Sequence, residues 1–369
     1  MKQFKDTFDK YQWDEVKASI QVKTSKDVEA ALAATHRTPE DFKALISPAA
    51  SPYLEQMAQL SHQLTQKRFG KTIQLFAPIY LSNKCNNICT YCGFSADHKI
   101  KRITLTADEI LQEIKVIKQY GYNHILLVTG ESGLAVHVDY FLEAIDIIRP
   151  HFANISLEVQ PLSQEEYTQL QHAGIYSVLV YQETYNKEKY KNYHLKGKKA
   201  DFYNRLETPD RIGRAGMHKI GLGVLLGLED WRTDSFFCAL HLNYLQKTYW
   251  QSKYSIAFPR IRPAEGVDIS NYHINDKELV QLLCAYRLLN EDLEISISTR
   301  ESEVFRNHLI KLGTTSMSAG SKTNPGGYSV NEESLEQFEI NDARTPEQVA
   351  AVITANGYEP VWKDWETIF

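Results

Sequence analysis

Three of the five cysteines in this 369-residue chain, Cys85, Cys89 and Cys92, fall within the eight residues CNNICTYC. Thiolates are soft ligands that select zinc, copper(I) or iron–sulfur clusters, so this spacing predicts a metal centre. A structural zinc site takes four ligands, and neither Cys238 nor Cys284 brings a second close pair. The spacing also differs from the ferredoxin run, in which two residues separate each of the first three cysteines. A closed four-thiolate site and an electron carrier are therefore disfavoured. Two alternatives to a catalytic metal centre with three thiolates stay open, a zinc site and a chance cluster of buried cysteines.

The elements that must position these thiols alternate regularly between apolar strands and helices. Near-continuous apolar runs are typical of strands that are covered on both faces. Eight short β-rich runs are present, and most of them have this apolar character, at residues 73–81, 124–130, 155–161, 177–183, 220–227, 254–261, 293–299 and 315–321. Eight strand–helix units of this length predict an α/β fold, a (βα)8 TIM-type barrel.

Helix signals separate the strands. Thr106 with Glu109, and Ser163 with Glu166, form capping boxes at the start of two crossover helices. Further helices are expected at residues 138–148, 201–215, 233–248, 276–290 and 301–312. We expect a helical N-terminal extension at residues 1–70, which packs on the barrel or forms a lid, the barrel at 71–325, and a C-terminal loop, helix and tail packing on it at 326–369.

Composition and charge narrow the class of protein. The net charge is −5, and no feature of the whole chain favours nucleic acid or anionic lipid as a partner. No apolar run is long enough for a signal peptide or a membrane span, and the cysteines are bunched rather than spread as a disulfide framework. We therefore expect a cytoplasmic enzyme that makes no contact with a membrane.

Polar side chains at the ends of the predicted strands are the candidates for catalysis, because a barrel gathers its reactive groups at that face. The second strand ends in Thr129, Gly130 and Glu131, and the third and fourth carry Glu158 and Glu183. The later strands supply a second set: Arg260, Arg262, Ser298, Arg300, Ser318 and Ser321. A single one of these residues is as often part of a structural ion pair, but their convergence on one mouth predicts a site.

The cysteine motif C-x3-C-x2-C, with an aromatic residue before its last cysteine, resembles the signature of radical S-adenosylmethionine enzymes. The resemblance implies a [4Fe-4S] cluster held by Cys85, Cys89 and Cys92, whose fourth iron stays open to bind S-adenosylmethionine. Tyr91 would lie near the adenine, and Gly130 with Glu131 resembles the segment that holds the methionine amino group. We also assign Glu158 and Glu183 to cofactor binding.

Longer segments resemble the aromatic amino acid lyase branch of these enzymes, and 2-iminoacetate synthases most closely. They include APIYLSNKCNNICTYCGFS, LEVQPLSQEEY, GVLLGLEDWR, FPRIRPAEG and SAGSKTNPGGY. The resemblance implies cleavage of the Cα–Cβ bond of L-tyrosine into 2-iminoacetate (dehydroglycine) and 4-methylphenol (p-cresol). S-adenosylmethionine would become methionine and 5'-deoxyadenosine, and the imine would supply the thiazole of thiamine.

That reaction requires a fixed cation for the substrate carboxylate. Arg300 is the first choice, because an arginine fork pairs both oxygens and fixes orientation as well as charge. Ser298, Ser318 and Ser321 are expected to help position the substrate. Arg260 or Arg262 could serve instead of Arg300, and sequence does not rank the three. No partner for the phenol and no histidine base is assigned.

The resemblance further implies a reducing electron donor such as flavodoxin or ferredoxin, and thiazole synthase as the partner that receives the imine. Three alternatives stay open: the tyrosine lyase of hydrogenase maturation, a tryptophan-cleaving relative, and a non-enzymatic iron–sulfur electron carrier. The first has extra cysteines in a C-terminal extension, whereas no cysteine follows Cys284 here.

Overall fold

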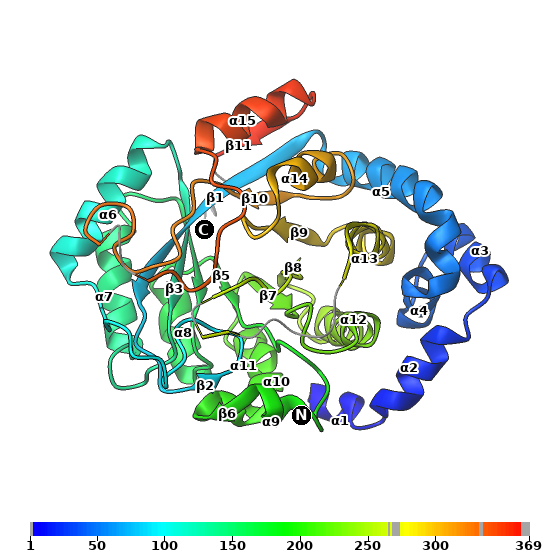
Figure 1. The fold of residues 1–369 in the computed structure, drawn as a ribbon, viewed down its shortest axis with the longest axis horizontal. Helices are drawn as coiled ribbons and strands as arrows, with labels where there is room; N and C mark the ends of the chain where they lie inside the picture. Colours follow the sequence, from blue (N-terminus) through cyan, green and yellow to red (C-terminus); the bar gives the residue numbers. More distant parts are fainter. Residues whose placement is uncertain (1–2, 265, 268–273, 332–334, 363–369) are drawn as a thin grey trace.

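The computed structural model describes residues 3–264, 266–267, 274–331 and 335–362, and within them eight parallel strands form a closed barrel (Figure 1). The barrel closes where β10 pairs with β1, with Gln74 beside Ser316 and Phe76 beside Ser318. All eight predicted strands and the (βα)8 fold class are confirmed. In chain order the strands are β1 (Thr72–Ser82), β3 (His124–Thr129), β4 (Asn154–Glu158), β5 (Ser177–Leu179), β7 (Lys219–Gly223), β8 (Lys253–Ala257), β9 (Glu294–Ile297) and β10 (Ser316–Ser318).

Helices cover the outside of the barrel, and both predicted capping boxes are present. The single helix predicted at residues 201–215 is wrong. Pro209 lacks an N–H and its ring would clash with the carbonyl four residues earlier, so the chain ends one helix and starts another. The covering helices are α6 (Ala107–Gln119), α7 (Val138–Ile148), α8 (Gln164–His172), α10 (Phe202–Leu206), α11 (Thr208–Arg214), α12 (Trp231–Thr248), α13 (Asp276–Leu289) and α14 (Glu303–Leu309).

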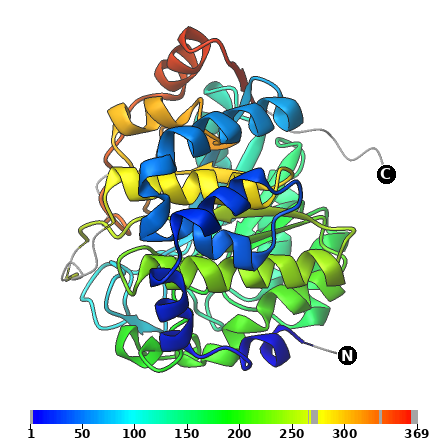
Figure 2. The ribbon, with the colours of Figure 1, turned by 90° about the vertical axis from the view of Figure 1, so that its right-hand side faces the viewer.

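The N-terminal extension is helical, as predicted, and lies across α12 and α13 on the outer wall of the barrel (Figure 2). It packs on the barrel side, in agreement with the expected packing role, and not over the mouth as the alternative of a lid would require. The elements are α1 (Phe4–Phe8), α2 (Trp13–Gln21), α3 (Ser25–Ala33), α4 (Pro39–Ile46), η1 (Pro48–Tyr53) and α5 (Leu54–Phe69).

The C-terminal part returns to the barrel. After β10 a loop leads to α15 (Pro346–Ala355), and β11 (Glu359–Val361) then pairs in parallel with the first residues of β1. Sequence reasoning missed β11, which at three residues is too short to show an alternating pattern. Trp362 packs against Tyr122 with ring centroids 5.3 Å apart, whereas Trp365 lies outside the described residues.

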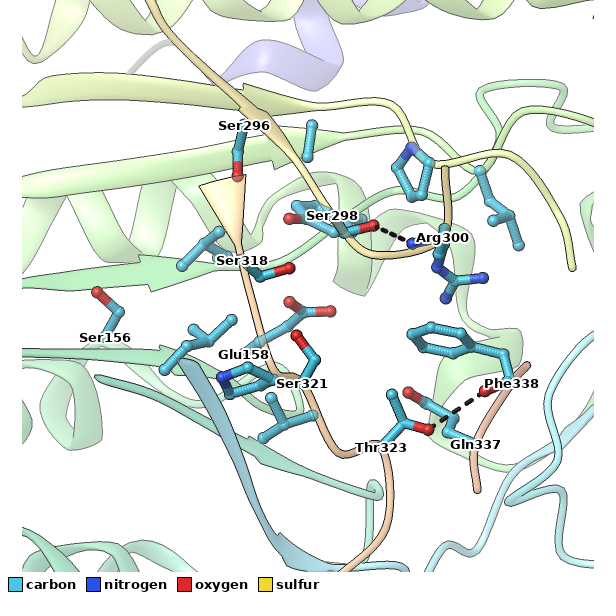
Figure 3. Close-up of a pocket in the computed structure, with 18 of the residues that line it drawn as sticks. Ser156, Glu158, Ser296, Ser298, Arg300, Ser318, Ser321, Thr323, Gln337 and Phe338 are labelled. Carbon is cyan, nitrogen blue, oxygen red and sulfur yellow. Dashed lines mark hydrogen bonds between the residues drawn. The ribbon is translucent and has the colours of Figure 1, made fainter. Parts of the chain in front are cut away.

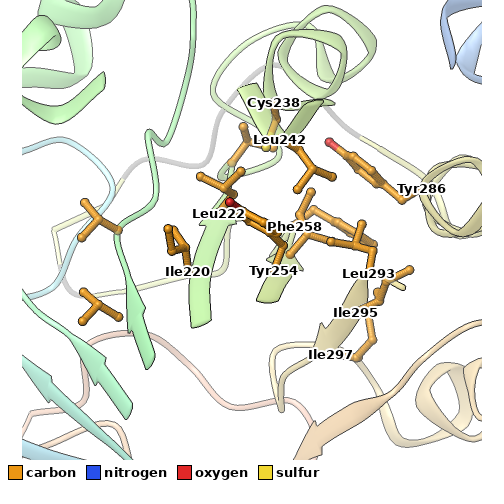
Figure 4. Close-up of a cluster of buried hydrophobic side chains, with 14 of the residues drawn as sticks. Ile220, Leu222, Cys238, Leu242, Tyr254, Phe258, Tyr286, Leu293, Ile295 and Ile297 are labelled. Atoms are coloured by element: carbon orange, nitrogen blue, oxygen red, sulfur yellow. The ribbon is translucent and has the colours of Figure 1, made fainter. Parts of the chain in front are cut away.

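The apolar core fills the space between the strands and the helices. In β9, Ile295 and Ile297 are buried, and they pack beside Tyr254 of β8 (Figure 4). The alternate residues Glu294 and Ser296 instead line the interior of the barrel. The strands therefore bury their outer face, and the lumen that they leave for a site is lined by polar side chains together with apolar ones such as Leu126 and Val128.

Cys238 and Cys284 belong to this outer core and are completely buried, as predicted.

Candidate active site at the barrel mouth

A cavity of about 240 Å³ extends inward from the carboxyl-terminal ends of the strands. Arg260 and Arg262, which are also predicted at the mouth, are not among the residues that line this cavity. The structure brings together in the lining the twelve residues assigned to cluster, cofactor or substrate: Cys85, Cys89, Tyr91, Cys92, Gly130, Glu131, Glu158, Glu183, Ser298, Arg300, Ser318 and Ser321. Their sequence separation exceeds two hundred residues, so only closure of the barrel makes them neighbours.

The cysteine loop, residues 83–95, follows β1 and is held by its surroundings. Cys89 lies in β2 (Ile88–Cys89), which pairs antiparallel with β6 (His194–Lys196). An added Cβ at Gly130 would lie 2.4 Å from the carbonyl oxygen of Lys84, so glycine is required for the loop to cross the end of β3. The guanidinium of Arg102 donates hydrogen bonds of 2.6–3.1 Å to the carbonyls of Asn83, Phe94, Ser95 and His98.

The three loop thiols all line the cavity. In the part of the chain that the structure describes, no group of three or more His, Cys, Asp or Glu side chains is arranged to hold one metal ion. A single ion needs its ligands around one point, whereas the thiolates of a cluster each bind a different iron atom. Burial raises the pKa of the Cys85 and Cys92 thiols, and the charge of Lys199 opposes this at Cys92.

Four buried charges form a network beside the cysteine loop. Arg205 Nη1 lies 2.7 Å from Glu131 Oε1, and Lys199 Nζ lies 2.8 Å from Glu183 Oε1. Asn87 Nδ2 of the loop donates to the second oxygen of Glu131 at 2.8 Å. Burial alone would raise the pKa of both carboxyls, but the cations outweigh it and the pKa values of Glu131 and Glu183 are lowered. The network holds two carboxylates charged at the mouth.

Glu183 of the network and the nearby Tyr91 each have a further structural feature. Glu183 has φ 69°, the single positive φ of a non-glycine residue among the described residues, and such strain concentrates at functional sites. The Tyr91 hydroxyl lies 2.7 Å from His194 Nε2, whose Nδ1 is 2.9 Å from the Tyr190 carbonyl. Because burial and Lys199 lower the pKa of His194, the ring is neutral, donates a hydrogen bond through Nδ1 and accepts one from the Tyr91 hydroxyl at Nε2.

The structure ranks the three arginines that sequence could not. Arg260 is paired with Glu301 and lies 2.8 Å from Asp276, and Arg262 donates to the Arg300 carbonyl at 2.5 Å. Neither lines the cavity. Across the described residues, the guanidinium of Arg300 has no hydrogen bond or ion pair, and its carbon lies 3.4 Å from the ring centroid of Phe338. Burial lowers the pKa of Arg300, as expected for a cation that lacks a counter-ion.

The serines near Arg300 differ in how they are used. Ser318 Oγ accepts a hydrogen bond from the Thr299 backbone at 3.2 Å, and Ser298 Oγ accepts a weak one from the Arg300 backbone at 3.4 Å. Ser321 Oγ is buried and has no hydrogen-bond partner among the described residues. Figure 3 shows Ser318, Ser321 and Glu158 on the inside of the same space, with Arg300 above Phe338.

Glu158 is affected both by the charged network beside the cysteine loop and by Arg300. Its carboxylate makes no hydrogen bond or ion pair with any described residue, and burial and the charge of Glu183 raise its pKa to about 7. The charge of Arg300 acts in the opposite direction. Near neutral pH this side chain can therefore donate or accept a proton.

Sequence reasoning missed several residues of the cavity wall. Gln337 connects the two halves: the Tyr80 hydroxyl donates to its Oε1 at 2.8 Å, and its Nε2 lies 3.7 Å from Cys92 Sγ. Gln337 and Phe338 lie in a loop without strand or helix signals, so no local pattern marks them. Lys199 and Arg205 were missed too, the first within a lysine-rich run typical of a surface and the second on a helix.

A TIM-type barrel with three clustered thiols and paired carboxylates at its mouth defines a radical S-adenosylmethionine enzyme, and residues 79–237 match the model of the radical SAM superfamily. Residues 257–359 match the biotin and thiamin synthesis associated domain. This match begins within the barrel part and runs into the C-terminal part, so the division at residue 325 stays a prediction.

The chain is 51% identical over 368 residues to 2-iminoacetate synthases of Salmonella typhimurium and of Escherichia coli K12, covering all of this chain and 98% of each relative. It therefore belongs to the 2-iminoacetate synthase family. Its fold is similar to the crystal structure of HydG, a maturase of the [FeFe]-hydrogenase, with a TM-score of 0.90 and 29% identity over 95% of this chain and 80% of that one. No helix in the described residues is long and apolar enough to cross a membrane.

Proposed function

We propose that this enzyme is a tyrosine lyase that cleaves the Cα–Cβ bond of L-tyrosine to give 2-iminoacetate and 4-methylphenol. S-adenosylmethionine is converted to 5'-deoxyadenosine and methionine in the same reaction. The observation that carries the proposal is Arg300: a half-buried guanidinium without an anionic partner in the described chain, at one end of a cavity whose other end holds three thiols. Such a cation favours an amino acid carboxylate as the ligand.

Cys85, Cys89 and Cys92 are the residues that would hold the [4Fe-4S] cluster, and they are the three cysteines that line the cavity. When bound, the cluster supplies the electron that splits S-adenosylmethionine, whose adenosyl group then removes a hydrogen atom from the substrate amine. Glu131 and Glu183, kept charged by Arg205 and Lys199, are placed to accept hydrogen bonds from the cofactor's amino and hydroxyl groups. The Thr129 hydroxyl, at the end of β3, is buried and has no hydrogen-bond partner within the described part of the chain.

Tyr91, with its hydroxyl fixed by His194, presents its ring beside this network for the adenine. Glu158 stands between the cofactor and substrate ends, and we keep it as a cofactor contact.

At the other end of the cavity, Arg300 binds the tyrosine carboxylate and fixes its orientation. Ser321 Oγ, buried and unpartnered, supplies a hydrogen bond, and Ser298 and Ser318 have acceptor capacity left for the amine or a water. The wall formed by Phe338, Gln337 and Tyr80 separates the substrate from solvent. Holding the amine next to the reacting carbon of the cofactor is the main task of these residues.

The reaction also defines the protein's surroundings. A low-potential electron donor such as flavodoxin or ferredoxin would reduce the cluster, and thiazole synthase would receive the short-lived imine for thiamine formation. We place both partners, and this enzyme, in the cytoplasm, because a cluster with three thiolates needs a reducing compartment.

Anaerobic reconstitution with iron and sulfide, followed by S-adenosylmethionine, tyrosine and a reductant, tests the proposal. Formation of 4-methylphenol with equal amounts of 5'-deoxyadenosine supports the lyase. Formation of 3-methylindole-type products from tryptophan instead would indicate the tryptophan-cleaving class. Cofactor cleavage without any cleavage of tyrosine would contradict the proposal.

A further inference from the structure

A lysine-rich segment covers the outer side of the cysteine loop. Residues 187–199 contain six lysines and one glutamate in a chain whose net charge is −5. The segment forms α9 (Tyr190–Tyr193), β6 and η2 (Lys198–Ala200), and Figure 1 shows β6 next to β2. We use the name lysine face for Lys191, Lys196 and Lys198 together with Leu195, all of which are exposed.

The lysines of this face are not used to stabilise the fold. None of the three ammonium groups has an ion pair or a hydrogen bond with another described residue. By contrast, Lys189 in the same segment lies 3.6 Å from Glu229, and Lys187 donates to the Tyr203 hydroxyl at 2.6 Å. Leu195 is 58% exposed between the lysines, which adds an apolar contact in the middle of a basic surface.

The lysine face is bound directly to the loop that carries the thiols. In the ladder between β2 and β6, Lys196 is opposite Ile88 and His194 is opposite Cys89. The Thr90 N–H donates to the Tyr193 carbonyl at 3.1 Å, and the Lys199 N–H donates to Asn87 Oδ1 at 3.0 Å. A protein seated on Leu195 is thus separated from Cys89 by two hydrogen-bonded strands.

We propose that the lysine face is the docking surface of an acidic one-electron carrier protein that reduces the centre held by the cysteine loop. This inference rests on the proposed function. One electron passes from the carrier, which is oxidised, to that centre, which is reduced, and no proton or group is transferred. Complementary charges steer such an encounter and raise its rate, whereas small interfaces keep redox complexes short-lived. The basic segment in a chain of net negative charge, beside the cysteine loop, provides the charge that is complementary to an acidic carrier.

The test is direct binding of an acidic flavodoxin to the intact protein, measured by calorimetry at low ionic strength. The variant K191E/K196E/K198E should bind it at least about tenfold more weakly. The control K26E/K115E/K277E changes the net charge equally at exposed positions on α3, α6 and α13, and it should bind like wild type. The difference should shrink in about 0.5 M salt, where charges are screened.

Turnover with two reductants provides the second measurement. With reduced methyl viologen, a small cation, both variants should form 4-methylphenol at the wild-type rate, while with reduced flavodoxin only the lysine-face variant should be slow. Equal flavodoxin binding by the two variants overturns the proposal. It is also overturned if the lysine-face variant binds flavodoxin like wild type but loses binding to anionic vesicles or to RNA. Absence of turnover with either reductant in wild type would count against the lyase activity and leave the binding result to decide the docking surface.

Discussion

The two ends of the cavity are built on opposite principles. At the cysteine end, the charges of Glu131, Glu183, Lys199 and Arg205 neutralise one another within the protein. At the other end, the half-buried Arg300 has no hydrogen bond or ion pair, and the buried Ser321 hydroxyl has no hydrogen-bond partner, within the described chain. Paired charges make a rigid frame that needs no ligand, whereas unpaired polar groups are costly until a ligand binds. The comparison indicates where the protein is already complete and where a substrate completes it.

The largest expected effect is loss of the thiol at the cysteine end. Cys89→Ala should reduce both iron content after reconstitution and formation of 4-methylphenol to the limit of detection, since among the described residues no cysteine outside the set Cys85, Cys89 and Cys92 lines the cavity to replace the lost ligand. Cys238→Ala is the matched control, because its thiol is buried in the outer core, and it should keep its iron and its activity. Normal iron content in Cys89→Ala would remove this residue from the ligand set.

Arg300→Lys tests the unpaired end. A lysine keeps the charge but cannot bind both carboxylate oxygens in one plane, so kcat/KM for tyrosine should fall about a hundredfold, close to 3 kcal/mol. Arg260→Lys, whose charge is already paired with Glu301, should change kcat/KM less than about threefold. Similar losses of kcat/KM in both variants would contradict the assignment of Arg300, and not Arg260, as the residue that binds the substrate carboxylate.

Lys199→Met breaks the paired end by leaving Glu183 and Glu131 with one cation. The free energy of unfolding of the cluster-free protein should fall by about 4 kcal/mol, because an uncompensated carboxylate is left buried. The neighbouring exposed Lys198→Met should change it by less than about 0.5 kcal/mol. Chemical denaturation measures both, and equal stabilities would mean that the network is not coupled to the fold.

Glu158 allows a test by pH. Its pKa is raised from the ordinary 4.5 to about 7, first by burial and then by Glu183, so the folded state binds more protons than the unfolded state between these values. Stability from this group is present below pH 4.5 and is lost as the pH rises through 7, by roughly 3 kcal/mol. Glu158→Gln should remove that loss, so its stability relative to wild type should increase with pH. A constant difference from pH 4.5 to pH 8 would contradict the raised pKa.

The smallest effect distinguishes two serines. Ser321→Ala removes a hydroxyl that has no partner, so stability should change by less than about 0.5 kcal/mol while KM for tyrosine rises severalfold. Ser318→Ala instead leaves the Thr299 N–H unpaired and should cost about 1 kcal/mol of stability. Denaturation and steady-state kinetics on both variants measure the contrast.

Sequence predicted the barrel because each strand is an apolar run with clear stops, and it predicted the site because strand ends converge in this fold. It did not find β2, β6 or β11, each two or three residues long, since so short a strand depends on its partner rather than on its own residues. It could not rank Arg260, Arg262 and Arg300, because the ranking depends on Glu301 and Phe338, which become neighbours only in the folded chain. The lysine run hid Lys199 for the same reason: alone among these lysines, it points inward to two carboxylates.

The most direct test of the two-ended cavity is equilibrium binding of S-adenosylmethionine and of tyrosine to the reconstituted Arg300→Lys protein. The arrangement of paired and unpaired groups predicts an affinity for S-adenosylmethionine within about twofold of wild type and an affinity for tyrosine at least about tenfold weaker. A variant that binds tyrosine normally and loses S-adenosylmethionine would contradict the assignment of the two ends.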